Sequence, residues 1–313
     1  MKKILLLGTG GTIACVPSAD GLVPQLDGAA LLQLVPQLDG LCRIDCKQIM
    51  NLDSSNLEPR HWQQMAEAVA HNYDAYDGIV ITHGTDTMAY SAAALSLMLQ
   101  NCRKPVIFTG AQLPMQAAGS DAHANVLHAF TAACSDVQGV CLAFGRLLIH
   151  GSCAKKLYTQ SFDGFGSVNR QPLAIFANGV LLWQMEGHRG GGWGNGVFSV
   201  NTKLESKVAV IKILPGTTPA ILDFYLQQGY KGLIIEGFGA GGVPNGSNNW
   251  LPQLQKVLQA GVKIICATQC LYDGVHLDTY PIGVLAQRLG AQSAGYATIE
   301  AATVKLMLEL GQE

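Results

Sequence analysis

Charged residues are scarce in this sequence. Lys, Arg, Asp and Glu account for 13% of its 313 residues, hydrophobic residues account for 49%, and the formal net charge is -2. Lysine and arginine form no run, so nothing predicts a nucleic-acid partner or binding to an anionic membrane. The apolar majority also excludes a disordered chain, because it is ample for a large buried core.

Long hydrophobic runs are missing as well. A transmembrane helix needs about 18 apolar residues or more, and no segment approaches that length. The apolar stretch near the start covers only residues 4–7, whereas the hydrophobic region of a signal peptide needs roughly 7–15 residues. We therefore expect a buried strand there rather than a signal peptide or a membrane anchor.

The cysteines show neither a disulfide pattern nor a zinc pattern. Their number, nine, is odd, and the Cys42/Cys46 and Cys266/Cys270 pairs are each separated by three residues rather than two. No paired histidines complete a zinc set. We expect no metal site, reduced and mostly buried thiols, and a cytoplasmic location.

What is present is an alternation of apolar strands and helices. Strands are expected at residues 4–7, 78–82, 104–109, 139–144, 208–213, 232–236 and 262–268. Helices are expected at residues 59–71, 89–100, 219–228, 249–261 and 299–310. Short apolar strands separated by helices predict an α/β fold whose parallel sheets are covered on both faces.

A glycine cluster interrupts this alternation and divides the chain. We predict two doubly wound parallel-sheet domains, a larger N-terminal one at 1–186 and a smaller C-terminal one at 208–313. Residues 187–207 are the predicted Gly-rich linker between them.

The first strand ends in the turn Gly-Thr-Gly-Gly-Thr at residues 8–12. This turn has Ile13 where a dinucleotide fingerprint needs glycine or alanine, and it lacks the Gly-Lys-Ser/Thr of a phosphate loop. A tight turn explains the glycines but not Thr12, since a turn has little need of a β-branched hydroxyl residue. Thr12 is therefore a candidate for chemistry.

A second strand ends in His-Gly-Thr-Asp-Thr-Met at residues 83–88. Capping of the following helix by Asp86 or Thr87 is one explanation of this cluster. The other is a ligand site, because ligands bind beyond the strand ends of open α/β sheets. Two such turns facing one substrate indicate an enzyme.

A threonine nucleophile needs a neighbour that takes its proton. A desolvated lysine can do so, because burial disfavours its charged form. Lys156 follows a short apolar strand and a glycine turn, which makes it the candidate. Taken alone, it is more simply explained as a solvated charge.

Together the segments 6–14 and 78–88 resemble the bacterial-type L-asparaginase family, most closely its cytoplasmic type I branch. Supporting matches lie at residues 53–57, 109–114, 120–121, 154–156, 162–165 and 268–270. The resemblance implies an amidohydrolase that converts L-asparagine to L-aspartate and ammonia through an acyl-enzyme. It also implies that no cofactor is needed and that the protein is a homodimer or homotetramer.

The resemblance further implies roles for individual residues. Thr12 would attack the side-chain amide. Thr85, Asp86 and Lys156 would handle the proton of the nucleophile or of the hydrolytic water.

Other residues would bind the substrate. Asp53, Ser54 and Ser55 would hold its α-carboxylate and α-ammonium, with the aspartate of the triad sharing the ammonium. Gly11 and Gly84 would lie against the substrate, and backbone N–H groups beside them would stabilise the oxyanion.

The sequence departs from the family in a predicted mobile lid, residues 16–25. Many members carry Gly-Tyr-x-Pro there, whereas this chain has Gly-Leu-Val-Pro with Leu22 in place of the tyrosine. Tyr280 is the candidate for a replacement hydroxyl, with ordinary packing as the alternative. Lys155 stands where allosteric type I enzymes usually have threonine, which puts substrate cooperativity in doubt. The run at 237–242 also lacks an asparagine found in relatives.

Three alternatives remain. A glutaminase-asparaginase of relaxed specificity differs by one methylene, and Ser55 favours asparagine only weakly. An asparaginase-like subunit of an archaeal glutamyl-tRNA amidotransferase is disfavoured by the lack of an extra N-terminal domain and of a basic patch. A non-catalytic amino-acid-binding module is disfavoured because binding alone needs no lysine at position 156.

Overall fold

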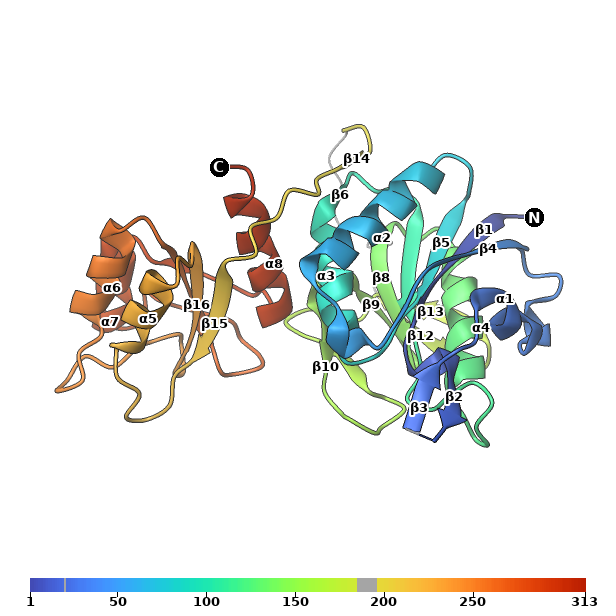
Figure 1. Cartoon of the computed structure of the whole chain (residues 1–313), viewed down its shortest axis with the longest axis horizontal. Helices are drawn as coiled ribbons and strands as arrows, with labels where there is room; N and C mark the ends of the chain where they lie inside the picture. The colour runs from blue at the N-terminus through green and yellow to red at the C-terminus, as the bar shows by residue number, and fades with distance from the viewer. Residues whose placement is uncertain (20, 185–195) are drawn as a thin grey trace. The chain divides into compact units, whose positions relative to one another are not determined.

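The computed structural model describes residues 1–19, 21–184 and 196–313. Contacts divide the chain into two compact units, Met1–Thr202 and Lys203–Glu313, which are coloured blue to yellow and yellow to red in Figure 1. The predicted linker at 187–207 lies partly outside the described residues, so its boundaries stay a prediction. Over the described ranges, no helix is both long and apolar enough to cross a membrane.

An eight-stranded sheet forms the centre of the first unit, counted over its described residues. Five parallel strands follow one another in the spatial order β4 (Arg43–Leu52), β1 (Lys3–Gly10), β5 (Gly78–Thr82), β7 (Pro105–Thr109) and β8 (Gly139–Phe144). Three antiparallel strands extend it: β9 (Leu147–His150), β12 (Ala174–Ala177) and β13 (Val180–Trp183). The chain leaves β1 for β4 on one side and returns to β5 on the other, which makes the end of β1 a topological switch point.

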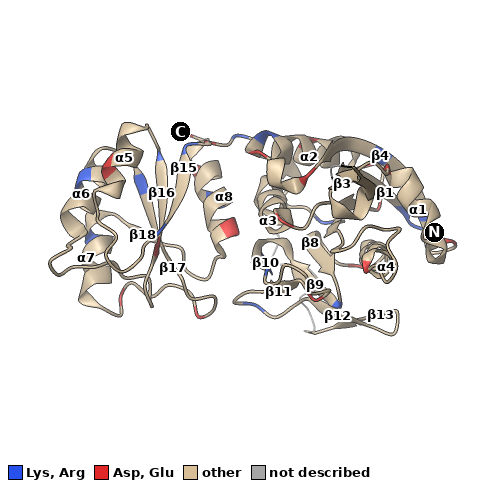
Figure 2. Ribbon diagram, turned by 60° about the horizontal axis from the view of Figure 1, so that its bottom comes forward, with Lys and Arg blue, Asp and Glu red and all other residues tan. Residues whose placement is uncertain are grey.

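Helices cover both faces of this sheet. The helices are α1 (Gly28–Gln33), α2 (Pro59–Asn72), α3 (Met88–Met98) and α4 (Ala122–Ala133). Ile4 and Leu6 of β1 belong to one apolar cluster with Leu31 of α1 and Phe130 of α4, so α1 and α4 share a face. Figures 1 and 2 both show α2 and α3 on the opposite face. Strand β1 is buried from Ile4 to Gly10 because it is covered on both sides.

One connection departs from the usual handedness. The crossovers β5–α3–β7 and β7–α4–β8 run in the same direction across the sheet, yet α3 and α4 lie on opposite faces. The crossovers through α1, α2 and α3 share one handedness. Almost all such connections are right-handed, so we assign the right hand to these three. The β7–α4–β8 connection is therefore left-handed. Its chain passes over the carboxyl edge of the sheet between Thr109 and Ala122.

The second unit has a four-stranded parallel sheet in its described residues. Its order is β15 (Val208–Lys212), β16 (Gly232–Gly237), β17 (Lys263–Thr268) and β18 (Gln292–Ser293). The helices α5 (Ile221–Gln227), α6 (Leu251–Gln259) and α7 (Pro281–Leu289) pack on one face, and α8 (Ile299–Leu310) packs on the other. The predicted fold class, two α/β units with mainly parallel sheets, is confirmed.

Candidate active site

Three strand ends meet at the switch point of the first sheet. The Gly11 N–H donates to the carbonyl of Leu52 at the end of β4, at 3.0 Å. The Thr9 hydroxyl donates to the carbonyl of Thr82 at the end of β5, at 2.7 Å. Gly11 has a φ of 79°, and a Cβ there would collide with the backbone of Gly84. Glycine at both positions lets the two turns touch backbone to backbone.

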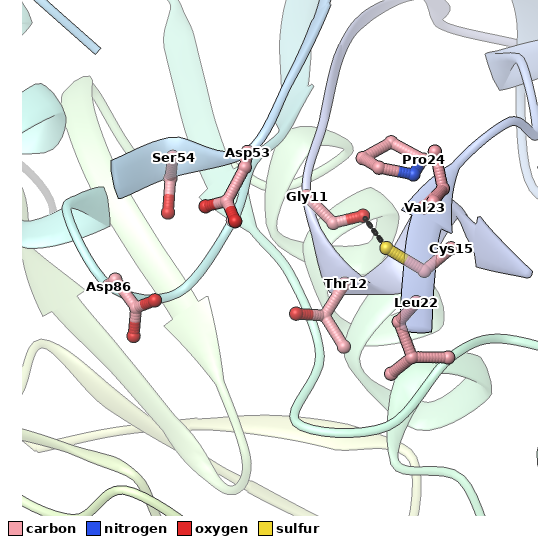
Figure 3. Close-up of a pocket in the computed structure, with 10 residues that line it drawn as sticks. Gly11, Thr12, Cys15, Leu22, Val23, Pro24, Asp53, Ser54 and Asp86 are labelled. Carbon is pink, nitrogen blue, oxygen red and sulfur yellow. Dashed lines mark hydrogen bonds between the residues drawn. The ribbon is translucent and has the colours of Figure 1, made fainter. Parts of the chain in front are cut away.

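A cavity of about 280 Å³ opens at this junction. Its lining residues are Gly11, Thr12, Cys15, Leu22, Val23, Pro24, Asp53, Ser54, Gly84 and Asp86. Thr12 begins the short 3-10 helix η1 (Thr12–Ala14). Figure 3 shows its hydroxyl directed toward Asp86 and away from Leu22. The two threonine-bearing turns thus share one cavity, as expected for neighbouring strand ends of one sheet.

Lys156 joins the second turn from a separate hairpin. It ends β10 (Ala154–Lys156), which pairs with β11 (Phe165–Ser167). Its Nζ donates to Thr85 Oγ1 at 2.9 Å and to Asp86 Oδ1 at 2.6 Å. The Lys156 side chain is 18% exposed and that of Asp86 is 64% exposed. The structure therefore brings together the three side chains of the predicted triad, with the lysine side chain mostly shielded and the carboxylate open.

The predicted substrate-binding residues lie at the end of β4. Ser54, 3% exposed, lines the cavity, and its carbonyl accepts a hydrogen bond from the Thr87 hydroxyl at 2.8 Å. Asp53 precedes the short helix η3 (Ser54–Asn56) and accepts from both the N–H and the hydroxyl of Ser55 at 2.9 Å. Ser55 is exposed and holds the Asp53 carboxylate in place.

A hairpin closes the other side of the cavity, within the predicted lid. It consists of β2 (Cys15–Ser18) and β3 (Gly21–Pro24). Cys15 was not among the predicted site residues, and no local pattern indicates it, because it reaches the cavity only through this hairpin. Its thiol donates to the Gly11 carbonyl at 3.4 Å. Burial and the nearby Asp53 charge raise the pKa of Cys15, so the thiol stays neutral beside Thr12.

Asp121 supports the site from behind. Its carboxylate is buried and accepts from the Gln112 N–H at 3.0 Å, the Leu113 N–H at 3.1 Å and the Asn125 amide at 3.0 Å. It thereby fixes the loop that crosses the edge of the sheet. In the same loop, the N–H of residue 115 donates to the Ile13 carbonyl at 3.2 Å, directly after the candidate nucleophile.

Two titratable residues lie apart from the cavity lining. His83 is completely buried, its Nδ1 donates to the Gly84 carbonyl at 2.7 Å, and burial lowers its pKa to about 4. It is a neutral support of the turn rather than a base.

Tyr280 belongs to the second unit, immediately before α7, and is 61% exposed. Its catalytic role stays a prediction. Among the described residues, no group of three or more His, Cys, Asp or Glu residues could hold a metal ion.

Comparison with known proteins identifies relatives along the whole chain. The family described as "Asparaginase, N-terminal" matches residues 3–187, and "Glutaminase/Asparaginase C-terminal domain" matches residues 207–313. An L-asparaginase of Thermococcus kodakarensis is 36% identical over 99% of this chain and 93% of its own length. A glutamyl-tRNA(Gln) amidotransferase subunit from Pyrococcus abyssi is 34% identical over 99% of this chain and 72% of its own length. The solved thermostable L-asparaginase from Thermococcus kodakarensis has a TM-score of 0.92 at 35% identity, over 99% of this chain and 93% of that chain.

Proposed function

This chain belongs to the asparaginase family and is an amidohydrolase, and we propose that it hydrolyses the side-chain amide of L-asparagine to L-aspartate and ammonia. The observation that carries the proposal is the pair of hydrogen bonds from Lys156 to Thr85 and Asp86 beside the cavity that holds Thr12. Binding an amino acid would not need a shielded lysine at this point, whereas activating a hydroxyl does.

The polar groups of the cavity suit the charged end of an amino acid. The Asp53 and Asp86 carboxylates would accept hydrogen bonds from the α-ammonium group, and the Ser54 hydroxyl would donate to the α-carboxylate. The Ser55 hydroxyl, which donates to Asp53, would keep that carboxylate in position. Charge-assisted hydrogen bonds of this kind are the strong ones. They would leave the side-chain amide over Thr12, which holds the reacting groups in a productive orientation.

Thr12 Oγ1 would attack the amide carbon and form a tetrahedral intermediate. Backbone N–H groups beside Gly11 and Gly84 would stabilise its oxyanion, a contribution worth about 10²–10³ in kcat for one donor. Thr85 would take the proton of Thr12 and pass its own hydroxyl proton to Lys156 in its neutral amine form, and Asp86 would stabilise the ammonium so formed.

Collapse of the intermediate breaks the C–N bond. The nitrogen leaves as ammonia with a proton returned by the same residues. Water then attacks the Thr12 ester, Lys156 and Thr85 again handle the proton, and L-aspartate is released.

The test is ammonia release from L-asparagine, L-glutamine and D-asparagine over a wide concentration range, with Thr12→Ala as the control. Turnover of L-asparagine that disappears in Thr12→Ala is the expected result. A rise in thermal stability with L-asparagine but no ammonia would contradict the proposal and favour a binding module. A sigmoidal rate curve would contradict the expectation that Lys155 weakens cooperativity.

Two neighbouring activities are supported by specific relatives. The name of the C-terminal family includes glutaminase, so L-glutamine is the second candidate substrate. The relative named as an amidotransferase subunit makes amide hydrolysis within a larger assembly the third candidate function. Comparable kcat/KM for both amino acids would support the second. We further propose a cytoplasmic homodimer or homotetramer, which light scattering would measure.

A further inference from the structure

The cavity has two walls of different chemistry, with Thr12 between them (Figure 3). Asp53, Ser54 and Asp86 form one wall. The opposite wall, which we call the apolar wall, consists of Cys15, Leu22, Val23 and Pro24 in the β2–β3 hairpin. The charged end of a substrate with a primary amide would contact the first wall, and little of that substrate would contact the apolar wall.

Hairpin register explains why the apolar wall is continuous. Leu22 and Pro24 are two residues apart in β3, so their side chains lie on the same face. Cys15 pairs directly with Pro24 across the hairpin, which places it on that face too. Val16 pairs with Val23 but is not among the residues that line the cavity.

No charge interrupts the apolar wall. The raised pKa of Cys15 keeps its thiol neutral, and the thiol proton is already donated to the Gly11 carbonyl. Leu22 is 54% exposed, so an apolar side chain at the edge of the cavity remains open to water. Burying this surface against a ligand is favourable.

Building on the proposed function, we infer that the apolar wall receives the leaving amine, and that the enzyme also hydrolyses β-aspartyl amides whose nitrogen carries a short alkyl chain. A substrate held by its α-ammonium and α-carboxylate at the polar wall has its carbonyl carbon at Thr12. The substituent on its amide nitrogen then extends toward Leu22.

The reaction balances as for the primary amide. Thr12 Oγ1 bonds to the carbonyl carbon, and the C–N bond breaks. The alkylamine leaves with the proton handled by Lys156 and Thr85, and water hydrolyses the ester to L-aspartate.

The experiment is a homologous series of L-aspartic acid β-N-methyl, ethyl, propyl and butyl amides. L-Aspartate, the common product, is measured to obtain kcat/KM. The amides share nearly the same intrinsic reactivity, so the slope along the series reports burial of the alkyl chain. We expect kcat/KM to rise by up to about fourfold for each added CH2.

Two matched variants test whether the apolar wall is responsible. Leu22→Ser should flatten the slope, whatever it does to the absolute rates, whereas Val16→Ser, in the same hairpin but outside the cavity lining, should retain it. A flat or falling slope in the wild type would overturn the inference, and so would an unchanged slope in Leu22→Ser. Absence of Thr12-dependent turnover of L-asparagine itself would instead overturn the proposed function.

Discussion

At the scale of single residues, the chemistry depends on how Lys156 is held. Its Nζ has two partners, a hydroxyl and a carboxylate, and its side chain is mostly shielded from solvent. A lysine with such partners can exchange a proton with Thr85 while Asp86 balances the charge. The side chain of the neighbouring Lys155 lies on the other face of the strand, because adjacent residues of β10 point to opposite faces.

Lys156→Met should therefore lower kcat for L-asparagine by about 10²–10⁴-fold, the usual contribution of general acid–base catalysis. Lys155→Met is the matched control and should retain most of the activity. Circular dichroism and thermal unfolding of both variants check the fold. Near wild-type kcat in Lys156→Met would show that the triad is assigned wrongly.

Variants at Leu22 and Tyr280 test what replaces the tyrosine hydroxyl that the lid lacks. If Tyr280 supplies it, Tyr280→Phe should lower kcat on the order of 10²-fold, and Leu22→Tyr should add little. Steady-state kinetics with L-asparagine measures both. A higher kcat in Leu22→Tyr together with an unchanged kcat in Tyr280→Phe would mean that the hydroxyl is absent rather than replaced.

At the scale of elements, the loop between β7 and α4 has the largest influence on the site. Asp121 accepts hydrogen bonds from two N–H groups of this loop and from the Asn125 amide of α4, and the loop in turn holds the Ile13 carbonyl. Removing a buried charged acceptor leaves its donors unpaired, which costs about 1–3 kcal/mol for each group. The position of Thr12 depends on the same contacts.

Asp121→Ala should lower the free energy of unfolding by about 3 kcal/mol or more and reduce kcat more than it changes KM. Ser120→Ala is the comparison, since the Ser120 hydroxyl donates to the Leu113 carbonyl in the same loop at 3.1 Å. The same hydroxyl accepts from the Ala122 N–H at 3.1 Å, and loss of these two neutral hydrogen bonds should cost about 1–2 kcal/mol. Urea unfolding and kinetics of the two variants measure the difference. A kcat/KM equal to that of the wild type in Asp121→Ala would exclude a positioning role.

Elements that are buried on both faces were predictable from the sequence. The runs that form β5 and β8 were predicted with their observed bounds, because every position in them is buried. Strand β4 was missed, since it is an edge strand whose exposed and half-buried residues follow no clean alternation. The side on which α4 packs was also unpredictable, because crossover handedness depends on the whole sheet. The triad could be predicted only by combining the motif at the end of β5 with a lysine from a distant segment.

At the scale of the whole molecule, two histidines, the buried His83 and the half-buried His150, make the response to acid predictable. Burial lowers the pKa of His83 to about 4. Burial and the Arg170 charge lower the pKa of His150 to about 4. In the unfolded chain both would take up protons near pH 6.5. The unfolded state therefore binds more protons than the folded state between about pH 6.5 and 4.

The free energy of unfolding should fall as the pH drops through this window, by at most about 3 kcal/mol for each histidine, and level off below about pH 4. Urea unfolding at pH 7 and pH 4.5 measures the change. His150→Gln should show a shallower dependence than the wild type. A free energy of unfolding that stays constant between these pH values would show that neither histidine is held neutral.

Because the chain crosses from one face of the first sheet to the other above the site, this connection is unsuitable for new chain ends. A circular permutant opened between Thr109 and Ala122 would keep every strand of the sheet, yet it would release the segment that holds the Ile13 carbonyl. A permutant opened in the turn at residues 178–179, between β12 and β13, cuts the sheet at its far edge. We expect the second permutant to remain active and the first to fold without turning over L-asparagine.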